Sequence, residues 1–192
     1  MKVAKFGGSS LANANQIKKV VDIILSDSER RIIVVSAPGK RLKEDTKVTD
    51  LLIILADSIL LGNDGNHELK IIMERFKSII EELSLSKELL DEINKDIKIR
   101  ISEDKSIAVK FKDGVKALGE DISAKIVAAY INSLGIKAKY ISPKDAGLLL
   151  SEEFGNATVL DKSYKNLSKL KNENALIIFP GFFGYTEKGD VV

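Results

Sequence analysis

Short β-branched runs alternate with longer segments of helical periodicity along this chain, and this alternation constrains its fold more than any other feature. The clearest runs are R-I-I-V-V-S at 31–36 and A-L-I-I-F at 175–179, which suit strands buried on both faces. Two shorter strands are expected at 3–6 and 138–141. The pattern predicts an α/β fold in which helices cover a mainly parallel sheet.

Apolar residues recur at helical spacing between these runs. Helices are expected at 13–26, 47–61, about 68–83 and about 86–103. The last two belong to a helical insertion at about 66–105, whose charged side chains we interpret as a solvated face. Residues 106–118 are ambiguous. Gly119-Glu120-Asp121 then stands at the entrance of a helix over 122–133, which Gly135 ends.

The C-terminal segments carry weaker signals. Residues 157–160 are a candidate for a further strand. Residues 185–192 suggest a strand, a turn at Lys188-Gly189-Asp190 and the start of a second strand. Because the chain stops within this apparent hairpin, we expect the domain to be truncated at Val192 and to continue in the natural protein.

Charge and composition exclude several classes of protein. The 30 basic and 28 acidic residues leave a net charge of +2, which gives no global argument for nucleic acid or a membrane as partner. Cysteine is absent and His67 is the only histidine, so disulfides, thiolate metal sites and histidine-based zinc sites are excluded. No apolar run approaches the roughly 20 residues that span a bilayer, and no leader is visible. We expect a cytoplasmic protein.

The segment K-F-G-G-S-S at 5–10 is the strongest chemical signal in the chain. It sets Lys5 at the end of a strand, then Gly7 and Gly8, then hydroxyl residues from Ser9 where a helix begins. Glycines let backbone N–H groups approach a ligand, and a helix start adds partial positive charge. The pattern indicates a phosphate site, although a tight strand-to-helix turn with a surface lysine would look similar.

Two further strand ends finish in suggestive turns, V-S-A-P-G at 35–39 and F-P-G-F-F-G at 179–184. Ligands of open α/β sheets collect beyond the carboxyl ends of the strands. Together with Glu120, these turns offer a cation, backbone donors, hydroxyls and a carboxylate around one crevice. Phosphoryl transfer needs such a set, because its catalysis is mostly positioning and neutralisation of charge.

At this point the chain resembles the aspartate kinases, within the wider amino-acid kinase family. The motifs that carry the resemblance are K-F-G-G-S-S at 5–10, V-V-S-A-P-G at 34–39, V-T-D-L-L at 48–52, G-E at 119–120 and P-G-F-F-G at 180–184. It implies a three-layer α/β/α sandwich of the amino-acid kinase type. It also implies transfer of the γ-phosphate of ATP, with Mg²⁺, to the side-chain carboxylate of L-aspartate. The product, 4-phospho-L-aspartate, begins the pathway to lysine, threonine and methionine.

The resemblance also implies roles for individual residues. Lys5 matches a lysine that neutralises the transferring phosphoryl group, and Gly7, Gly8 and Ser9 match the loop that approaches the phosphates. Ser36 and Thr49 match hydroxyl residues of the amino-acid site, and Glu120 matches the carboxylate that holds the substrate ammonium. No protein side chain is implied as a metal ligand.

Each of the last three residues also has a simpler interpretation. Ser36 could satisfy backbone groups at a strand end, and Thr49 could be the N-cap of the following helix. Glu120 could be a favourable carboxylate at a helix start. The residues alone leave these alternatives open.

The chain departs from the family pattern in two ways. Gly147 stands where the family usually has an arginine, and a later G-R-G-G-S-D segment is missing. We therefore expect residues 1–192 to be the N-terminal, amino-acid-binding part of a catalytic domain. The nucleotide half and the regulatory domains are absent from it. The isolated chain is expected to be inactive, and the full-length form to be a homo-oligomer.

Two other functions remain open from the sequence. One is a different amino-acid kinase, acting on glutamate or acetylglutamate. The other is a non-catalytic half-domain that needs a partner chain.

Overall fold

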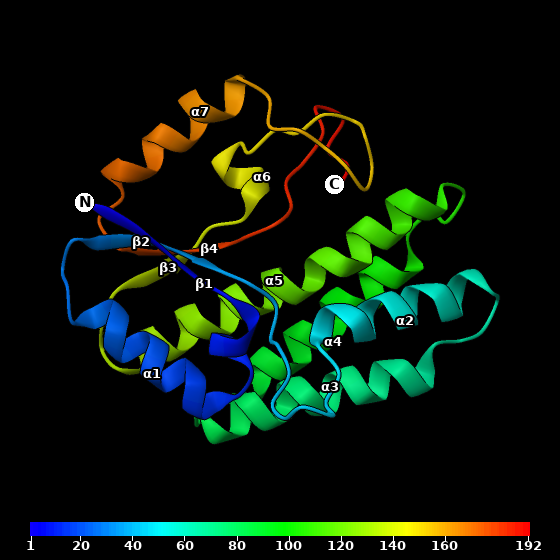
Figure 1. Cartoon of the computed structure of the whole chain (residues 1–192), viewed down its shortest axis with the longest axis horizontal. Coiled ribbons are helices and arrows are strands. Elements are labelled where there is room, and N and C mark those ends of the chain that lie inside the picture. Colours follow the sequence, from blue (N-terminus) through cyan, green and yellow to red (C-terminus); the bar gives the residue numbers. More distant parts are fainter.

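A computed structural model describes all of residues 1–192, and its centre is a four-stranded parallel sheet with the strand order β1-β2-β4-β3 (Figure 1). The strands are β1 (Lys2–Phe6), β2 (Arg30–Val35), β3 (Ala138–Tyr140) and β4 (Leu176–Pro180). All four expected strands are confirmed, with small differences at their ends.

Helices cover both faces of this sheet. In chain order they are α1 (Ala14–Leu25), α2 (Val48–Leu60), α3 (Asn66–Glu82), α4 (Lys87–Ser102), α5 (Ala108–Ser133), α6 (Pro143–Ala146) and α7 (Lys162–Leu167), with 3₁₀ turns η1 (Gly8–Leu11) and η2 (Ser168–Asn172). Helices α1 and α5 pack on one face, whereas α6 and α7 lie over the other (Figure 1). Helices α2 and α4 extend the first layer by packing with α5, and α3 packs against α2 and α4.

Adjacent residues of β4 show how the two layers are stabilised. Ile178 joins the large apolar core that includes α1, α2 and α5, while its neighbours Ile177 and Phe179 join a smaller core with Ala146 of α6. Side chains alternate between the faces of a strand, so an entirely apolar strand supplies both cores. The predicted three-layer α/β/α sandwich with a mainly parallel sheet is confirmed.

The register of the sheet brings three strand ends together. Phe6 of β1 lies beside Val35 of β2, and Val35 lies beside Pro180 of β4. The ladder continues one step further, because Ser36 N–H donates to Phe6 (3.2 Å) and Gly181 N–H donates to Val35 (2.9 Å). The turns that follow these strands therefore start at one edge of the sheet, as expected for a ligand site.

Helix α5 is longer than predicted. It runs unbroken from Ala108 to Ser133, so the expectation that Gly119-Glu120 stands at a helix entrance was wrong. The two glycines in this stretch had weakened the helical signal. They are accommodated because neighbours pack against them: an added Cβ would lie 2.7 Å from Ala37 Cβ at Gly119 and 3.2 Å from Arg100 Cδ at Gly114. Gly135 follows the helix end with φ +78°, as expected for a C-terminal glycine.

The C-terminal segments pair only briefly. The candidate strand at 157–160 is reduced to one antiparallel bridge between Leu150 and Val159. In 185–192 the expected hairpin forms as a short ladder, in which Gly184 and Val192 exchange both backbone hydrogen bonds. No helix of the structure combines the length and the apolar character that crossing a membrane requires.

Candidate active site

A cavity of about 900 Å³ opens at the carboxyl edge of the sheet. Five of the residues singled out from the sequence line it, namely Gly8, Ser9, Ser36, Thr49 and Glu120. They come from four separate places: the turn after β1, the loop after β2, the first turn of α2, and the middle of α5. The topology thus brings together most of the predicted site.

Two glycines fix the turn after β1 to the loop after β2. Gly39 N–H donates to the Gly8 carbonyl at 2.7 Å. An added Cβ at Gly8 would lie 2.8 Å from the Ala37 carbonyl oxygen, and one at Gly39 would lie 2.6 Å from the Gly8 carbonyl carbon. Real Cβ atoms do not approach backbone so closely, so glycine at both positions lets the two loops touch.

Glu120 is attached to the same loop from the other side. Its Oε1 accepts a hydrogen bond from Ala37 N–H at 3.1 Å, and the residue is only 8% exposed. The absence of a side chain at Gly119 allows Ala37 to approach α5. Burial raises the pKa of the Glu120 carboxyl to about 6, although the Ala37 bond opposes the shift. A partly desolvated carboxylate in a cavity wall is a site for a cationic group.

Thr49 is the second residue of α2 and lines the cavity. The N-cap residue is Lys47, whose side chain makes no capping bond, so the interpretation of Thr49 as an N-cap was wrong. Val48 N–H instead donates to the Pro38 carbonyl at 3.0 Å. This bond ties the start of α2 to the loop, and Thr49 lines the same cavity as Ser36.

Lys5 and Gly7 are not among the residues that line the cavity. Lys5 is exposed, and its Nζ lies 4.5 Å from the ring centroid of Phe182, which does line the cavity. Phe182 has φ +66°, a backbone conformation uncommon for a residue with a side chain. The contact with Phe182 places Lys5 next to the cavity rather than in its wall.

The turn after β1 has the features that a phosphate group needs. An added Cβ at Gly7 would meet nothing within 4 Å, so its backbone faces open space. The amides of Gly8 and Ser9 donate to no other backbone group. Free amides, open backbone and a nearby lysine fit a polyphosphate. Nowhere in the structure do three or more His, Asp or Glu side chains gather in a way suited to a metal ion.

Two cavity residues were missed by the sequence analysis. Asp113 and Lys116 lie on α5 seven and four positions before Glu120, so they share its helical face. Asp113 is buried, accepts a bond from Gly155 N–H at 2.6 Å and pairs with Lys116 at 2.6 Å. This spacing was a usable signal, but it was lost because residues 106–118 were not recognised as helix.

Comparison with known proteins agrees with this geometry. The model of the amino acid kinase family matches residues 1–192. The chain belongs to the amino acid kinase family. It is 48% identical over 192 residues to aspartokinase 3 of Bacillus subtilis. The match covers all of this chain and 42% of that protein.

Solved structures show the same fold. A crystal structure of Clostridium acetobutylicum aspartate kinase matches 99% of this chain and 40% of its own, with a TM-score of 0.77 and 32% identity. Escherichia coli aspartokinase III, solved in complex with aspartate and ADP, matches 99% of this chain and 42% of its own, with a TM-score of 0.80 and 23% identity. The chain thus spans about two fifths of the length of these aspartokinases.

Proposed function

We propose that this chain is the amino-acid-binding part of a kinase that phosphorylates the side-chain carboxylate of L-aspartate. The observation that carries the proposal is the buried Glu120 carboxylate in the wall of a cavity that also holds Ser36 and Thr49. The similarity to aspartokinase 3 of B. subtilis supports aspartate as the acceptor. The reaction would give 4-phospho-L-aspartate and supply amino-acid biosynthesis.

In this proposal Glu120 binds the α-ammonium group of aspartate. A charge pair in a partly desolvated wall is stronger than the same pair in water. Binding would also favour the ionised form of Glu120 and lower the pKa that burial has raised. Ser36 and Thr49 would donate or accept hydrogen bonds to the carboxylates of the substrate. Their positions at a strand end and a helix start keep both hydroxyls on fixed backbone.

Lys5, Gly7, Gly8 and Ser9 would face the phosphates of ATP. The free amides of Gly8 and Ser9 would donate to phosphate oxygens, and Lys5 would neutralise charge that develops during transfer. ATP supplies the phosphoryl group, and Mg²⁺ bound largely through the phosphates would neutralise part of their charge. The acceptor carboxylate is already ionised at pH 7, so the reaction requires no general base.

The proposal also assigns the parts of the active site to different regions of the whole protein. Residues 1–192 would supply the amino-acid site and the phosphate turn, with the helical insertion at about 66–105 supporting them. The nucleotide-base pocket, any regulatory domains and the surfaces of a homo-oligomer would come from further residues, as the relatives' greater length suggests. The 192-residue chain alone should therefore bind aspartate and turn over negligibly.

Calorimetry on the 192-residue chain tests the amino-acid site. We expect L-aspartate to bind more tightly than L-glutamate, and Glu120→Gln to weaken aspartate binding at least ten-fold because it removes the charge that pairs with the ammonium group. Glu81→Gln, an exposed change on α3, is the control and should bind like the unmodified chain. Equal binding by the Glu120→Gln variant would contradict the proposal.

Catalysis is tested on a fusion of this chain to the remaining residues of B. subtilis aspartokinase 3. Acyl phosphates react with hydroxylamine, so trapping the product as a hydroxamate reports transfer to a carboxylate. We expect hydroxamate formation that depends on ATP, Mg²⁺ and L-aspartate in the fusion, and none above background in the 192-residue chain. Rapid turnover by the 192-residue chain itself would overturn the proposed division of labour.

A further inference from the structure

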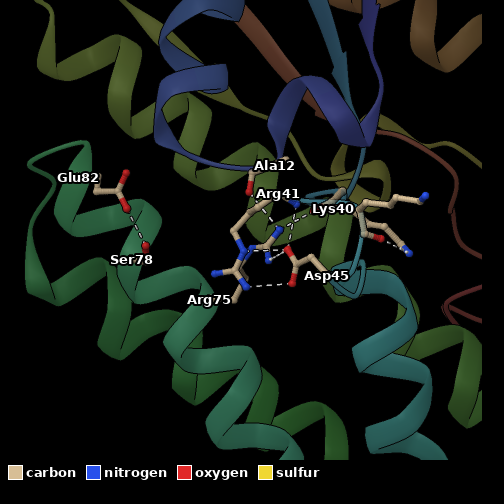
Figure 2. Close-up of polar contacts among 9 residues, drawn as sticks. Ala12, Lys40, Arg41, Asp45, Arg75, Ser78 and Glu82 are labelled. Carbon is tan, nitrogen blue, oxygen red and sulfur yellow. Dashed lines mark hydrogen bonds and ion pairs between the residues drawn. The ribbon is translucent and has the colours of Figure 1, made fainter.

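Arg75 is the most deeply buried charged residue of the chain and takes no part in the function described above. It lies on α3, within the helical insertion, and is 4% exposed. Its guanidinium reaches out of the helix towards two segments that flank the cavity (Figure 2). We call these the first segment, residues 7–12, and the second segment, residues 36–47.

The guanidinium makes contacts with both segments. Nη1 pairs with Asp45 of the second segment at 2.5 Å, and Nη2 donates to the Ala12 carbonyl of the first segment at 3.1 Å. Nη2 also donates to the Gly39 carbonyl in the second segment. Gly39 is the residue whose N–H bonds to Gly8. One side chain therefore ties together the turn with the free amides and the loop with Ser36.

Asp45 completes the arrangement within the second segment. The Arg41 guanidinium donates to both carboxylate oxygens of Asp45, at 2.7 and 2.9 Å (Figure 2). The backbone N–H of Arg41 also donates to the Asp45 carboxylate, at 2.9 Å. These bonds, followed by those of Arg75, hold the pKa of Asp45 well below its usual range. The Asp45 carboxylate thus joins two positions within the second segment, Arg41 and Asp45, and pairs with Arg75 of α3.

Stability alone is a poor reason for this group. Burial lowers the pKa of Arg75, and its Nε has no hydrogen-bond partner. Apolar residues of similar volume often replace a buried ion pair without loss of stability. What they cannot do is hold two separate backbone segments at fixed positions, for which the planar fork of arginine is suited.

We propose that Arg75 is a positioning residue that aligns the acceptor side of the site with its phosphate side. The first segment carries Gly8 and Ser9, and the second carries Ser36 and runs directly into Thr49. Their relative position decides whether a bound carboxylate and a bound phosphate can meet. The helical insertion thereby contributes to the site without lining the cavity. The inference rests on the proposed function only for its ligand readout.

The first experiment measures the order of the second segment directly. This segment contains four trypsin sites, at Lys40, Arg41, Lys43 and Lys47. Cleavage requires a loop to open over several residues, so its rate under native conditions reports how firmly the loop is held. We expect Arg75→Met, which keeps an unbranched side chain but removes the guanidinium, to accelerate cleavage in 40–47 at least ten-fold while circular dichroism shows a folded chain.

Two further variants separate positioning from general loss of an arginine. Arg75→Lys keeps the charge but has one nitrogen for acceptors on two segments, so we expect cleavage close to that of Arg75→Met. Arg30→Met is the control: Arg30 also donates to a backbone carbonyl, of Ile23, but stands at the amino end of β2, away from the cavity. It should cleave like the unmodified chain. If Arg75→Met does not fold, Asp45→Asn replaces it, and faster cleavage is again expected.

The second experiment measures L-aspartate affinity by calorimetry in the same variants. We expect Arg75→Met to weaken binding at least five-fold and Arg30→Met to leave it unchanged. Unaltered affinity in a variant whose loop is cleaved faster would overturn the positioning role, as would unaltered cleavage. If the unmodified chain binds no aspartate, the proposed function fails, and the cleavage rates alone decide whether Arg75 fixes the two segments.

Discussion

Glu120, in the middle of α5, accepts a hydrogen bond from the backbone N–H of Ala37, a residue 83 positions earlier in the chain. This bond joins the longest helix to the loop that follows β2 and fixes a carboxylate at the wall of the cavity. The same carboxylate is largely desolvated, and burial raises its pKa to about 6. The site residue is therefore held in place at a cost to stability.

The first prediction follows from this raised pKa. Between the ordinary value of 4.5 and about 6, the folded chain binds more protons at Glu120 than the unfolded chain, so the free energy of unfolding falls as pH rises through this window. The rise of the pKa from 4.5 to about 6 corresponds to roughly 2 kcal/mol. Glu120→Gln removes this dependence and should be more stable than the unmodified chain by about that amount at pH 7, but not at pH 4.

Urea unfolding of both chains between pH 4 and 7 checks this prediction. Other titrating groups cancel in the difference between the two chains. A difference that stays constant over the whole range would show that burial does not shift the Glu120 carboxyl. Weaker aspartate binding together with higher stability is the combination expected of a functional residue in a costly environment.

The second prediction concerns the two glycines of α5. Gly119→Ala places a Cβ 2.7 Å from Ala37 Cβ, and this overpacking should cost about 1–3 kcal/mol of stability. Gly114→Ala is the matched change in the same helix, because its nearest neighbour is the flexible Arg100 side chain at 3.2 Å. It should be neutral or stabilising by up to about 1 kcal/mol, since alanine favours helix. Thermal unfolding compares the two, and equal effects would contradict the packing argument.

The third prediction concerns Asp113, whose carboxylate accepts the Gly155 N–H bond. Asp113→Ala leaves this amide without its partner and should cost about 1–3 kcal/mol. Hydrogen exchange at the Gly155 amide should accelerate at the same time. The control is Asp190→Ala, which removes the carboxylate that pairs with Lys110 of α5. Because this pair is more exposed, its loss should cost less than about 1 kcal/mol. Unchanged exchange at Gly155 in Asp113→Ala would argue that the loop is held by other contacts.

The fourth prediction concerns Lys5. In the fusion with the remaining residues of B. subtilis aspartokinase 3, Lys5→Met should lower the rate of hydroxamate formation by about 10²-fold or more, because a fixed cation acts where charge develops. Aspartate affinity should change little, since Lys5 lies outside the cavity lining. Lys2→Met, on the same strand but at its amino end, should leave the rate unchanged. A loss of affinity as large as the loss of rate would place Lys5 in substrate binding instead.

Some of the site could be read from the chain because the signals were local. The turns after β1 and β2 showed as glycine and proline directly after β-branched runs, and Ser36 and Thr49 were found through the motifs around them. Residues 106–118 were ambiguous for a similar reason. Two glycines lowered the local helix signal, and only packing against Ala37 and Arg100 makes them fit.

The burial of Arg75 and of Asp113 gave no comparable signal. Arg75 is one charged residue among many on an amphipathic helix, where a solvated face is the usual interpretation, and Asp113 lies in a stretch that was not recognised as helix. Their burial is decided by partners far away in the chain, Ala12 and Asp45 for Arg75 and Gly155 for Asp113. The residues next to Arg75 and Asp113 in the sequence therefore do not predict these partners.

The sequence by itself determined the parallel sheet, the order of its four strands and of the longer helices along the chain, and the residue types available at the carboxyl edge. These follow from periodicity and backbone preference, which act over a few residues. The tertiary structure alone decided that Glu120 meets Ala37, that Lys5 stands beside the cavity at Phe182, and that Arg75 joins the two flanking segments. Such contacts depend on the register of strands and on close packing, and both are set only when distant segments come together.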